Sequence, residues 1–166
     1  MRSALLILPA AAAVIAGCGA TDAGRPAGAP TATTSAKHAV VNTRHGSLGT
    51  FLVDGSGRTL YLFKKDTGPR SRCFGSCAAN WPPVTTRERP EAKGAAKASL
   101  LSTSRRGRTK QVVYAGHPLY RFVGDSRPGQ TNGQGLNAFG AKWWVVSPAG
   151  QAIRASGASA PSPYGY

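Results

Sequence analysis

The chain has 166 residues and a formal net charge of +15, from 21 lysines and arginines against only 6 acidic residues. It contains no Gly-x-Ser-x-Gly elbow and no His-Glu-x-x-His motif, which excludes the hydrolase chemistries built on those motifs. Since carboxylates for acid–base work are also scarce, we expect no enzymatic activity.

The first residues have the features of an export signal. Met1-Arg2 is followed by an apolar stretch from Ala4 to Ala16, which at roughly 13 residues is too short to span a bilayer. The sequence Ile15-Ala16-Gly17-Cys18 resembles a bacterial lipobox, in which the cysteine is acylated and becomes the mature N-terminus. We therefore predict a lipoprotein signal peptide over residues 1–17, lipidation of Cys18, and anchoring at the extracytoplasmic face of the cell membrane.

Segments poor in large apolar residues flank the central part of the chain. Residues 18–44 are mostly Ala, Gly, Thr, Pro and Ser. Because such a segment cannot bury a core, we predict a flexible stalk carrying the lipidated cysteine. Residues 151–166 are similarly small and Pro-rich, which predicts a disordered tail. Residues 45–150 remain as one folded domain.

The folded region contains one phrase twice, Tyr61-Leu-Phe63-Lys-Lys-Asp66 and Tyr120-Arg-Phe122-Val-Gly-Asp125. This predicts two repeats, over about residues 46–86 and 100–150. Alternation places the aromatic residues on one face of a strand and their neighbours on the other, so the aromatic residues should lie in the core. We expect each aspartate to fix the turn of its own repeat. The alternative is that Asp66 and Asp125 meet near a pseudo-twofold axis and share a proton or a cation.

The remaining elements follow in chain order. A hairpin is predicted over residues 45–63, turning at Asp54-Gly55. Residues 85–99 form a surface connection with one helical turn between Glu91 and Leu101. A second hairpin runs from Lys110 to Val123 and turns at Ala115-Gly116, and residues 142–146 form the last strand. These elements predict an all-β, mostly antiparallel fold, with two repeats of hairpin units in one small sandwich or barrel-like domain with long loops.

Cys73 and Cys77 are the only cysteines after Cys18. An even pair in an exported protein indicates a disulfide, and closure of so short a loop contributes only about 2 kcal/mol. Alternatively, the two thiolates and a histidine, His117, His45 or His38, could hold copper, zinc or haem in a redox or electron-transfer module. Covalent haem is not indicated because Cys-x-x-Cys-His is absent, and we expect no cofactor.

Four residues are candidates for ligand binding. Trp143 and Trp144 are adjacent, so on a strand they face opposite sides: one fills the core, and the other, beside the Gly-rich residues 129–140, would suit stacking on a sugar ring or flat cofactor. Trp81 and His117 are the other two candidates, although His117 precedes a proline and is typical of a turn or surface position.

The positive charge also indicates a class of partner. After Gly17 there are 20 basic residues, with a denser run at Arg105, Arg106, Arg108 and Lys110. On an exported protein this charge would attract anionic lipid head groups or anionic envelope polymers. Nucleic acid is not expected as a partner, because export separates the chain from chromosomal DNA.

Several phrases together resemble the bacterial secreted-repeat lipoproteins that share a Tyr-x-aromatic-x-x-Asp motif. The resemblance covers Gly46 to Gly150 and includes both motif copies, the cysteine loop with the sequence after it, and two phrases of the second repeat: Cys73-Phe-Gly75-Ser-Cys77-Ala78, Trp81-Pro82-Pro83, Gly116-His117-Pro118-Leu119-Tyr120 and Thr131-Asn132-Gly133-Gln134-Gly135. The chain departs at Arg105-Arg106-Gly107-Arg108, where a polar or acidic tip is more usual. The resemblance implies an envelope lipoprotein domain without an established activity. We accordingly expect a non-enzymatic binding or structural module.

Overall fold

The structure is a computed structural model that describes residues 38–154. These residues all belong to the second of the two units into which the chain divides. The predicted signal peptide, Cys18, the stalk as far as residue 37 and the tail from residue 155 lie outside the described residues.

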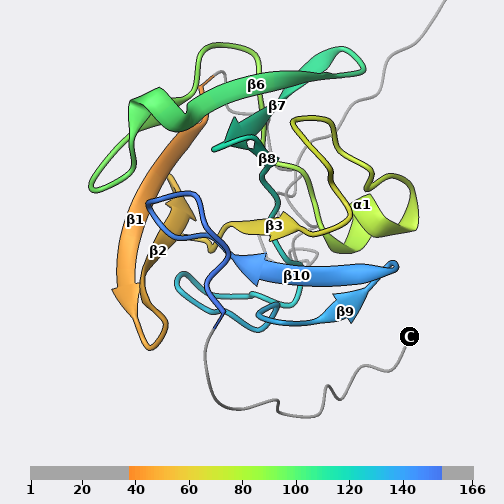
Figure 1. Ribbon diagram of the computed structural model, residues 1–166. Helices are drawn as coiled ribbons and strands as arrows, with labels where there is room; N and C mark the ends of the chain where they lie inside the picture. Colours follow the sequence, from red (N-terminus) through yellow and green to blue (C-terminus); the bar gives the residue numbers. More distant parts are fainter. Residues whose placement is uncertain (1–37, 155–166) are drawn as a thin grey trace, which may run out of the picture. The chain divides into compact units, whose positions relative to one another are not determined.

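The described chain is built of short strands in three small sheets (Figure 1). The strand orders are β2-β1-β5, β3-β10-β9 and β4-β7-β6, with β8 added to β7, and β1–β5 is the parallel pair among antiparallel ones. The elements are β1 (Val40–Gly46), β2 (Gly49–Asp54), β3 (Tyr61–Phe63), α1 (Ser76–Asn80), β4 (Thr85–Thr86), β5 (Glu91–Ala92), a 3-10 turn (Ala98–Leu100), β6 (Leu101–Arg106), β7 (Thr109–Tyr114), β8 (His117–Pro118), β9 (Asn137–Ala138) and β10 (Ala141–Val145). The predicted fold class is confirmed, with open sheets instead of a closed barrel in this part of the chain.

Each repeat begins with a tight antiparallel hairpin. In the second, Arg106 pairs with Thr109 across a turn whose first central residue, Gly107, has φ 58°. That left-handed conformation is open to glycine and matches the twist of two-residue hairpins. The sequence did not predict β6, because its polar residues show no apolar alternation.

The boundaries of the predicted domain were wrong at both ends. Strand β1 begins at Val40, within the predicted stalk, because Val41 is fully buried and Ala39 nearly so. At the other end, Ala152 bridges Val146, and Ile153 N donates to Val145 O at 2.8 Å. The disordered tail was therefore predicted to start too early, since Ala152 and Ile153 pair with the end of β10 and the residue after it.

Two further expectations about the elements need correction. The Asp54-Gly55 turn does bring Leu60 N to Leu52 O at 3.0 Å. However, β2 pairs mainly with β1, and β3 pairs with β10 from the second repeat. The connection after β4 contains strand β5 at Glu91–Ala92, which adds to β1, and its helical turn is confined to Ala98–Leu100.

The two repeats exchange their C-terminal segments. Val84, from repeat one, donates its N–H to Leu119 O at 2.9 Å and accepts a hydrogen bond from Val112 N at 2.8 Å. Val146, from repeat two, does the same with Leu60 O at 3.2 Å and Leu52 N at 2.8 Å. Each repeat thus completes the hairpin of the other, which relates them by a pseudo-twofold axis.

The core has an aliphatic and an aromatic cluster, divided by strand alternation. Leu60 and Leu62 lie in the aliphatic cluster, whereas Tyr61 and Phe63 lie in the aromatic one. Leu119 and Tyr120 divide in the same way. The predicted alternation is confirmed for the first copy of the motif. In the second copy it holds for Leu119 and Tyr120 but was wrong beyond them, because residues 121–123 lie outside any strand and Val123 is exposed. Both tyrosines lie at the centre of the fold.

Candidate functional site

The repeated motifs meet at their tyrosines. Tyr61 N donates to Tyr120 O at 2.9 Å, and Tyr120 N donates to Tyr61 O at 3.0 Å. The side chains cross over: the Tyr61 hydroxyl donates to Asp125 Oδ2 and the Tyr120 hydroxyl to Asp66 Oδ2, both at 2.6 Å. Each tyrosine is therefore bound by the aspartate of the opposite repeat.

The second oxygen of each aspartate holds its own loop. Asp66 Oδ1 accepts a hydrogen bond from Arg72 N at 2.7 Å, and Asp125 Oδ1 accepts one from Asn132 N at 2.9 Å. The expected turn role is thus present, but it is combined with a bond between repeats that sequence reasoning did not anticipate. The two carboxylates bind tyrosines instead of sharing a proton or a cation between them.

Burial controls the protonation of these groups. It raises the pKa of Asp66 and Asp125 above the ordinary carboxyl range, and the tyrosine hydrogen bonds counteract part of that rise. Burial and the adjacent carboxylates also raise the pKa of the Tyr61 and Tyr120 phenols. The phenols therefore stay protonated at neutral pH and serve as hydrogen-bond donors rather than as acid–base groups.

A continuous stack of rings fills the space beside the tyrosines. Trp143 stacks on Phe63 and Trp81 with ring centroids 4.0 and 3.9 Å apart, and Trp81 stacks on Phe122 at 4.3 Å. Trp81 and Trp143 are almost completely buried. Because their faces are covered by other rings, neither of these two candidates offers a free face for stacking on a ligand. Of the adjacent pair Trp143 and Trp144, Trp143 is the one that fills the core.

The other two candidates lie nearer the surface. Trp144 is half-buried against the aliphatic cluster and lies close to Gly135, where an added Cβ would be 3.4 Å from its ring. His117 is half-buried, and its Nδ1 is buried without a hydrogen-bond partner. Burial, with Lys64 nearby, lowers the pKa of His117, so the ring is neutral at pH 7.

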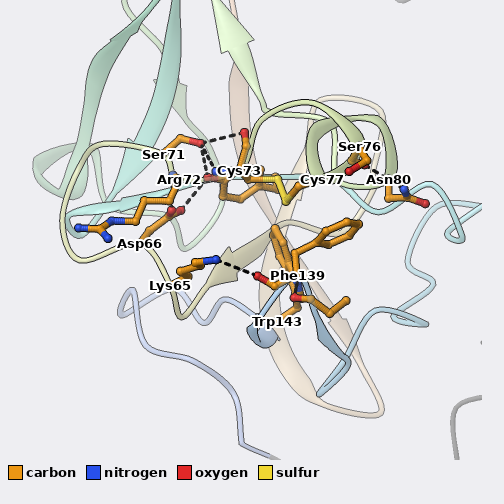
Figure 2. The surroundings of a disulfide bond; sticks show 12 residues. Lys65, Asp66, Ser71, Arg72, Cys73, Ser76, Cys77, Asn80, Phe139 and Trp143 are labelled. Atoms are coloured by element: carbon orange, nitrogen blue, oxygen red, sulfur yellow. Dashed lines mark hydrogen bonds between the residues drawn. A yellow bond between two sulfur atoms is a disulfide. The ribbon is translucent and has the colours of Figure 1, made fainter. Parts of the chain in front are cut away.

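The two cysteines form the predicted disulfide, with Cα atoms 5.2 Å apart (Figure 2). Because both sulfurs are used in this bond, neither is available as a thiolate ligand, and the alternative metal set of Cys73, Cys77 and His117 is not assembled. His38 and His45 instead bond to Glu91 and Thr50. Within residues 38–154 no three His, Cys, Asp or Glu side chains gather as a metal site.

One arginine of the β6–β7 turn organises the disulfide loop, which sequence reasoning missed. Arg106 donates to Cys73 O at 2.6 Å and Ser71 Oγ at 2.7 Å, and also to Gln111 Oε1 at 3.0 Å. Its guanidinium lies 4.6 Å from the centroid of the Phe74 ring. The sequence shows only a run of basic residues at this turn, and nothing in that run indicates which partners Arg106 has.

An ion pair also joins the repeats. Arg121 Nε donates to Asp54 Oδ2, and the Asp54 side chain is almost fully buried. Asp54 Oδ1 accepts from the backbone of its own turn, at Ser56 and Arg58. The arrangement as a whole positions loops and joins repeats, and its tyrosines, aspartates and Arg121 are bonded to one another or to the backbone.

Comparisons with known proteins agree with this architecture. The family described as a secreted repeat of unknown function matches residues 42–85 and 103–147, one match for each hairpin and motif copy. No curated protein and no solved structure gives a match. Among the described residues, no helix has the length and apolar character needed to cross a bilayer. Because the two matches cover more than half of the chain, the protein belongs to this family of secreted repeats.

Proposed function

We propose that the chain is a non-enzymatic binding module of the bacterial cell envelope, anchored to the membrane by lipid on Cys18, that engages anionic envelope polymers or lipids. Membership of a secreted family supports an extracellular location. The lipobox-like sequence before Cys18 supports the anchor.

The observation that carries the binding role is the unequal burial of charge. Of the five acidic residues between 38 and 154, three are buried and bonded within the fold: Asp54, Asp66 and Asp125. The other two, Glu88 and Glu91, are exposed. The same range holds 18 lysines and arginines. The described surface is therefore even more cationic than the composition implies, and such a surface attracts polyanions.

The arrangement of polar side chains supports a non-enzymatic role. The motif tyrosines are held as protonated donors, and their aspartate partners are buried. A catalytic carboxylate or phenol needs access to a substrate and a pKa near the working pH. These groups instead stabilise the junction between the repeats.

Retention on an immobilised poly(glycerol phosphate), the backbone of teichoic-type polymers, tests the binding role. We expect the chain from Gly19 to Tyr166, which keeps every residue of the described fold, to stay bound at about 0.15 M salt and to elute as salt screens the charge. The control is an unrelated protein of equal net charge and size. If both proteins elute at the same salt concentration, the proposed binding function is wrong.

A separate experiment tests the anchor. Cells producing the full chain should incorporate labelled fatty acid into it and retain it in the membrane fraction, whereas Cys18→Ala should abolish the label. Membrane retention without any label on Cys18 would contradict the lipid anchor.

A further inference from the structure

Two large hydrophobic side chains are exposed among residues 38–154, Phe74 at 61% and Val123 at 50%. Both lie against helix α1. Phe74 O accepts a hydrogen bond from Cys77 N in the helix, and Val123 N donates to Asn80 O at its end, each at 3.1 Å. We use the name α1 face for Phe74, Ser76, Ala79 and Val123, which lie in this helix or are bonded to its ends. Its members are exposed and uncharged.

The α1 face holds Phe74 in a rigid setting. The disulfide closes the loop that contains Phe74, and Arg106 binds the carbonyl of Cys73. The guanidinium of Arg106 also lies against the ring, at 4.6 Å from its centroid. An aromatic side chain that is already fixed loses little conformational freedom when it is buried by a partner.

Exposed arginines lie in the two chain segments next to Phe74. Arg70 and Arg72 lie in the loop before the disulfide, and Arg105 and Arg108 lie at the β6–β7 turn that Arg106 connects to that loop. All four side chains are exposed. Residues 67–80 and 105–108 contain no acidic residue. We call these four arginines the rim. The two segments that carry them are uniformly positive, which is complementary to a surface of negative charge.

A lipid surface fits this combination better than a soluble polymer. Arginines alone suffice for a hydrated polyanion, in which a protruding Phe74 finds no apolar environment. The interfacial region of an anionic bilayer offers phosphates at the level of the arginines and acyl chains beneath them. A surface that joins exposed apolar side chains to neighbouring cations is suited to that boundary.

We propose that the α1 face docks on the anionic bilayer surface, with Phe74 and Val123 inserted below the headgroups and the rim arginines bound to lipid phosphates. This rests on the proposed function and specifies its surface and its ligand. In the docked state, the Cys73–Cys77 loop and α1 would lie against the membrane.

Vesicle binding by the Gly19–Tyr166 chain tests the proposal, since this form lacks the predicted acylation site. The probes are vesicles of phosphatidylcholine with and without phosphatidylglycerol, at about 0.15 M salt. We expect binding only with phosphatidylglycerol, and we expect Phe74→Ser to reduce the partition coefficient roughly tenfold or more. The reduction should persist at higher salt, because it reflects lost apolar insertion.

A matched pair of double variants tests the rim. Arg105→Gln with Arg108→Gln should weaken vesicle binding by roughly tenfold or more, whereas Arg87→Gln with Arg89→Gln, exposed arginines elsewhere, should have a smaller effect at the same net charge. Unchanged far-ultraviolet circular dichroism shows that each variant is folded.

The outcomes separate the two proposals. If vesicle binding does not depend on Phe74, or depends equally on both arginine pairs, the α1 face is not the docking surface, although retention on poly(glycerol phosphate) can still stand. If neither vesicles nor the polymer bind the chain more strongly than a protein of equal charge, the proposed function fails together with this inference.

Discussion

The motif tyrosines give their hydroxyl groups to carboxylates of the opposite repeat, and this explains why tyrosine and aspartate occur together in each copy. The tyrosine of each copy donates a hydrogen bond to the aspartate of the other copy. A phenol buried in an aromatic cluster needs a hydrogen-bond acceptor, and a buried carboxylate needs donors. Each crossed tyrosine–aspartate pair therefore gives the phenol its acceptor and the carboxylate a donor, and the duplication produces two such pairs.

Removing either hydroxyl should destabilise the fold. In Tyr61→Phe or Tyr120→Phe the Oδ2 atom of a buried aspartate loses its donor, which costs about 1–3 kcal/mol of unfolding free energy. Urea unfolding followed by circular dichroism measures this cost. A loss below about 0.5 kcal/mol, within the range of neutral surface changes, would contradict the structural role given to the crossed pairs.

A glycine beside the aromatic stack should be intolerant of a methyl group. A Cβ on Gly133 would lie 2.7 Å from Trp81 Cη2 and 3.0 Å from Tyr61 Cε1. Because Trp81 is held between two stacked rings, Gly133→Ala should lower the unfolding free energy by about 1–3 kcal/mol. Gly55→Ala is the matched control, since its Cβ would make only an ordinary contact of 3.4 Å with Val40. Equal urea midpoints of unfolding for the two variants would contradict this prediction, since they would show that the aromatic stack moves aside for the methyl group without a measurable loss of stability.

The buried aspartates also predict how stability changes with pH. Since burial raises the pKa of Asp66 and Asp125 above the unfolded value of about 3.9, the folded chain binds more protons between that value and the raised pKa. The unfolding free energy should therefore fall as the pH rises through this window, and the stabilisation is fully present only below the unfolded value.

Urea unfolding from pH 3 to pH 7 measures how steeply the unfolding free energy changes with pH. Replacement of both aspartates, by Asp66→Asn with Asp125→Asn, should flatten it. His117 contributes in the opposite sense at higher pH, because its pKa is lowered and neutral imidazole is favoured in the fold. A wild-type slope that survives unchanged in the double variant would refute the assignment to these carboxylates.

Among the elements, the loop between β3 and β4 depends on the disulfide and on Arg106 more than on regular structure. Replacement of both cysteines by serine opens a ring of five residues and should lower the unfolding free energy by about 2 kcal/mol by the chain-entropy model. The strands should persist, because the bond closes only a local loop.

Thermal or urea unfolding of the double serine variant measures this effect, and wild-type chain treated with reductant should match it. If removal of the disulfide abolished the β signal in circular dichroism, the bond would be supporting the sheets as well as the loop.

Local patterns predicted the elements only where apolar residues alternate. The Tyr61–Phe63 strand, the Ala115-Gly116 turn and the strand carrying Trp143 follow from alternation and turn chemistry. Strand β6 could not be predicted, because its residues, LSTSRR, are polar and its identity comes from pairing with β7. Candidate site residues were harder still, since Arg106 and Asp54 acquire their roles from partners distant in sequence.

At the scale of the whole described unit, neither repeat should fold alone. The first repeat lacks Val146 to cover Leu52 and Leu60, and the second lacks Val84 for Val112 and Leu119. Fragments divided between Ala95 and Ala96 should each be disordered when separate and should regain the β signal when mixed in equal amounts. Independent cooperative unfolding of either fragment would show that the exchange is not required for stability.

The exchange of C-terminal segments also bears on how the polypeptide leaves the cell. Since Val146, which bonds to Leu52 and Leu60, follows nearly all of the second repeat in the sequence, the first repeat cannot be completed until the second has been made available. In a chain exported from its N-terminus, the fold would form only once the second repeat has also emerged. Prematurely terminated products would then remain open to envelope proteases.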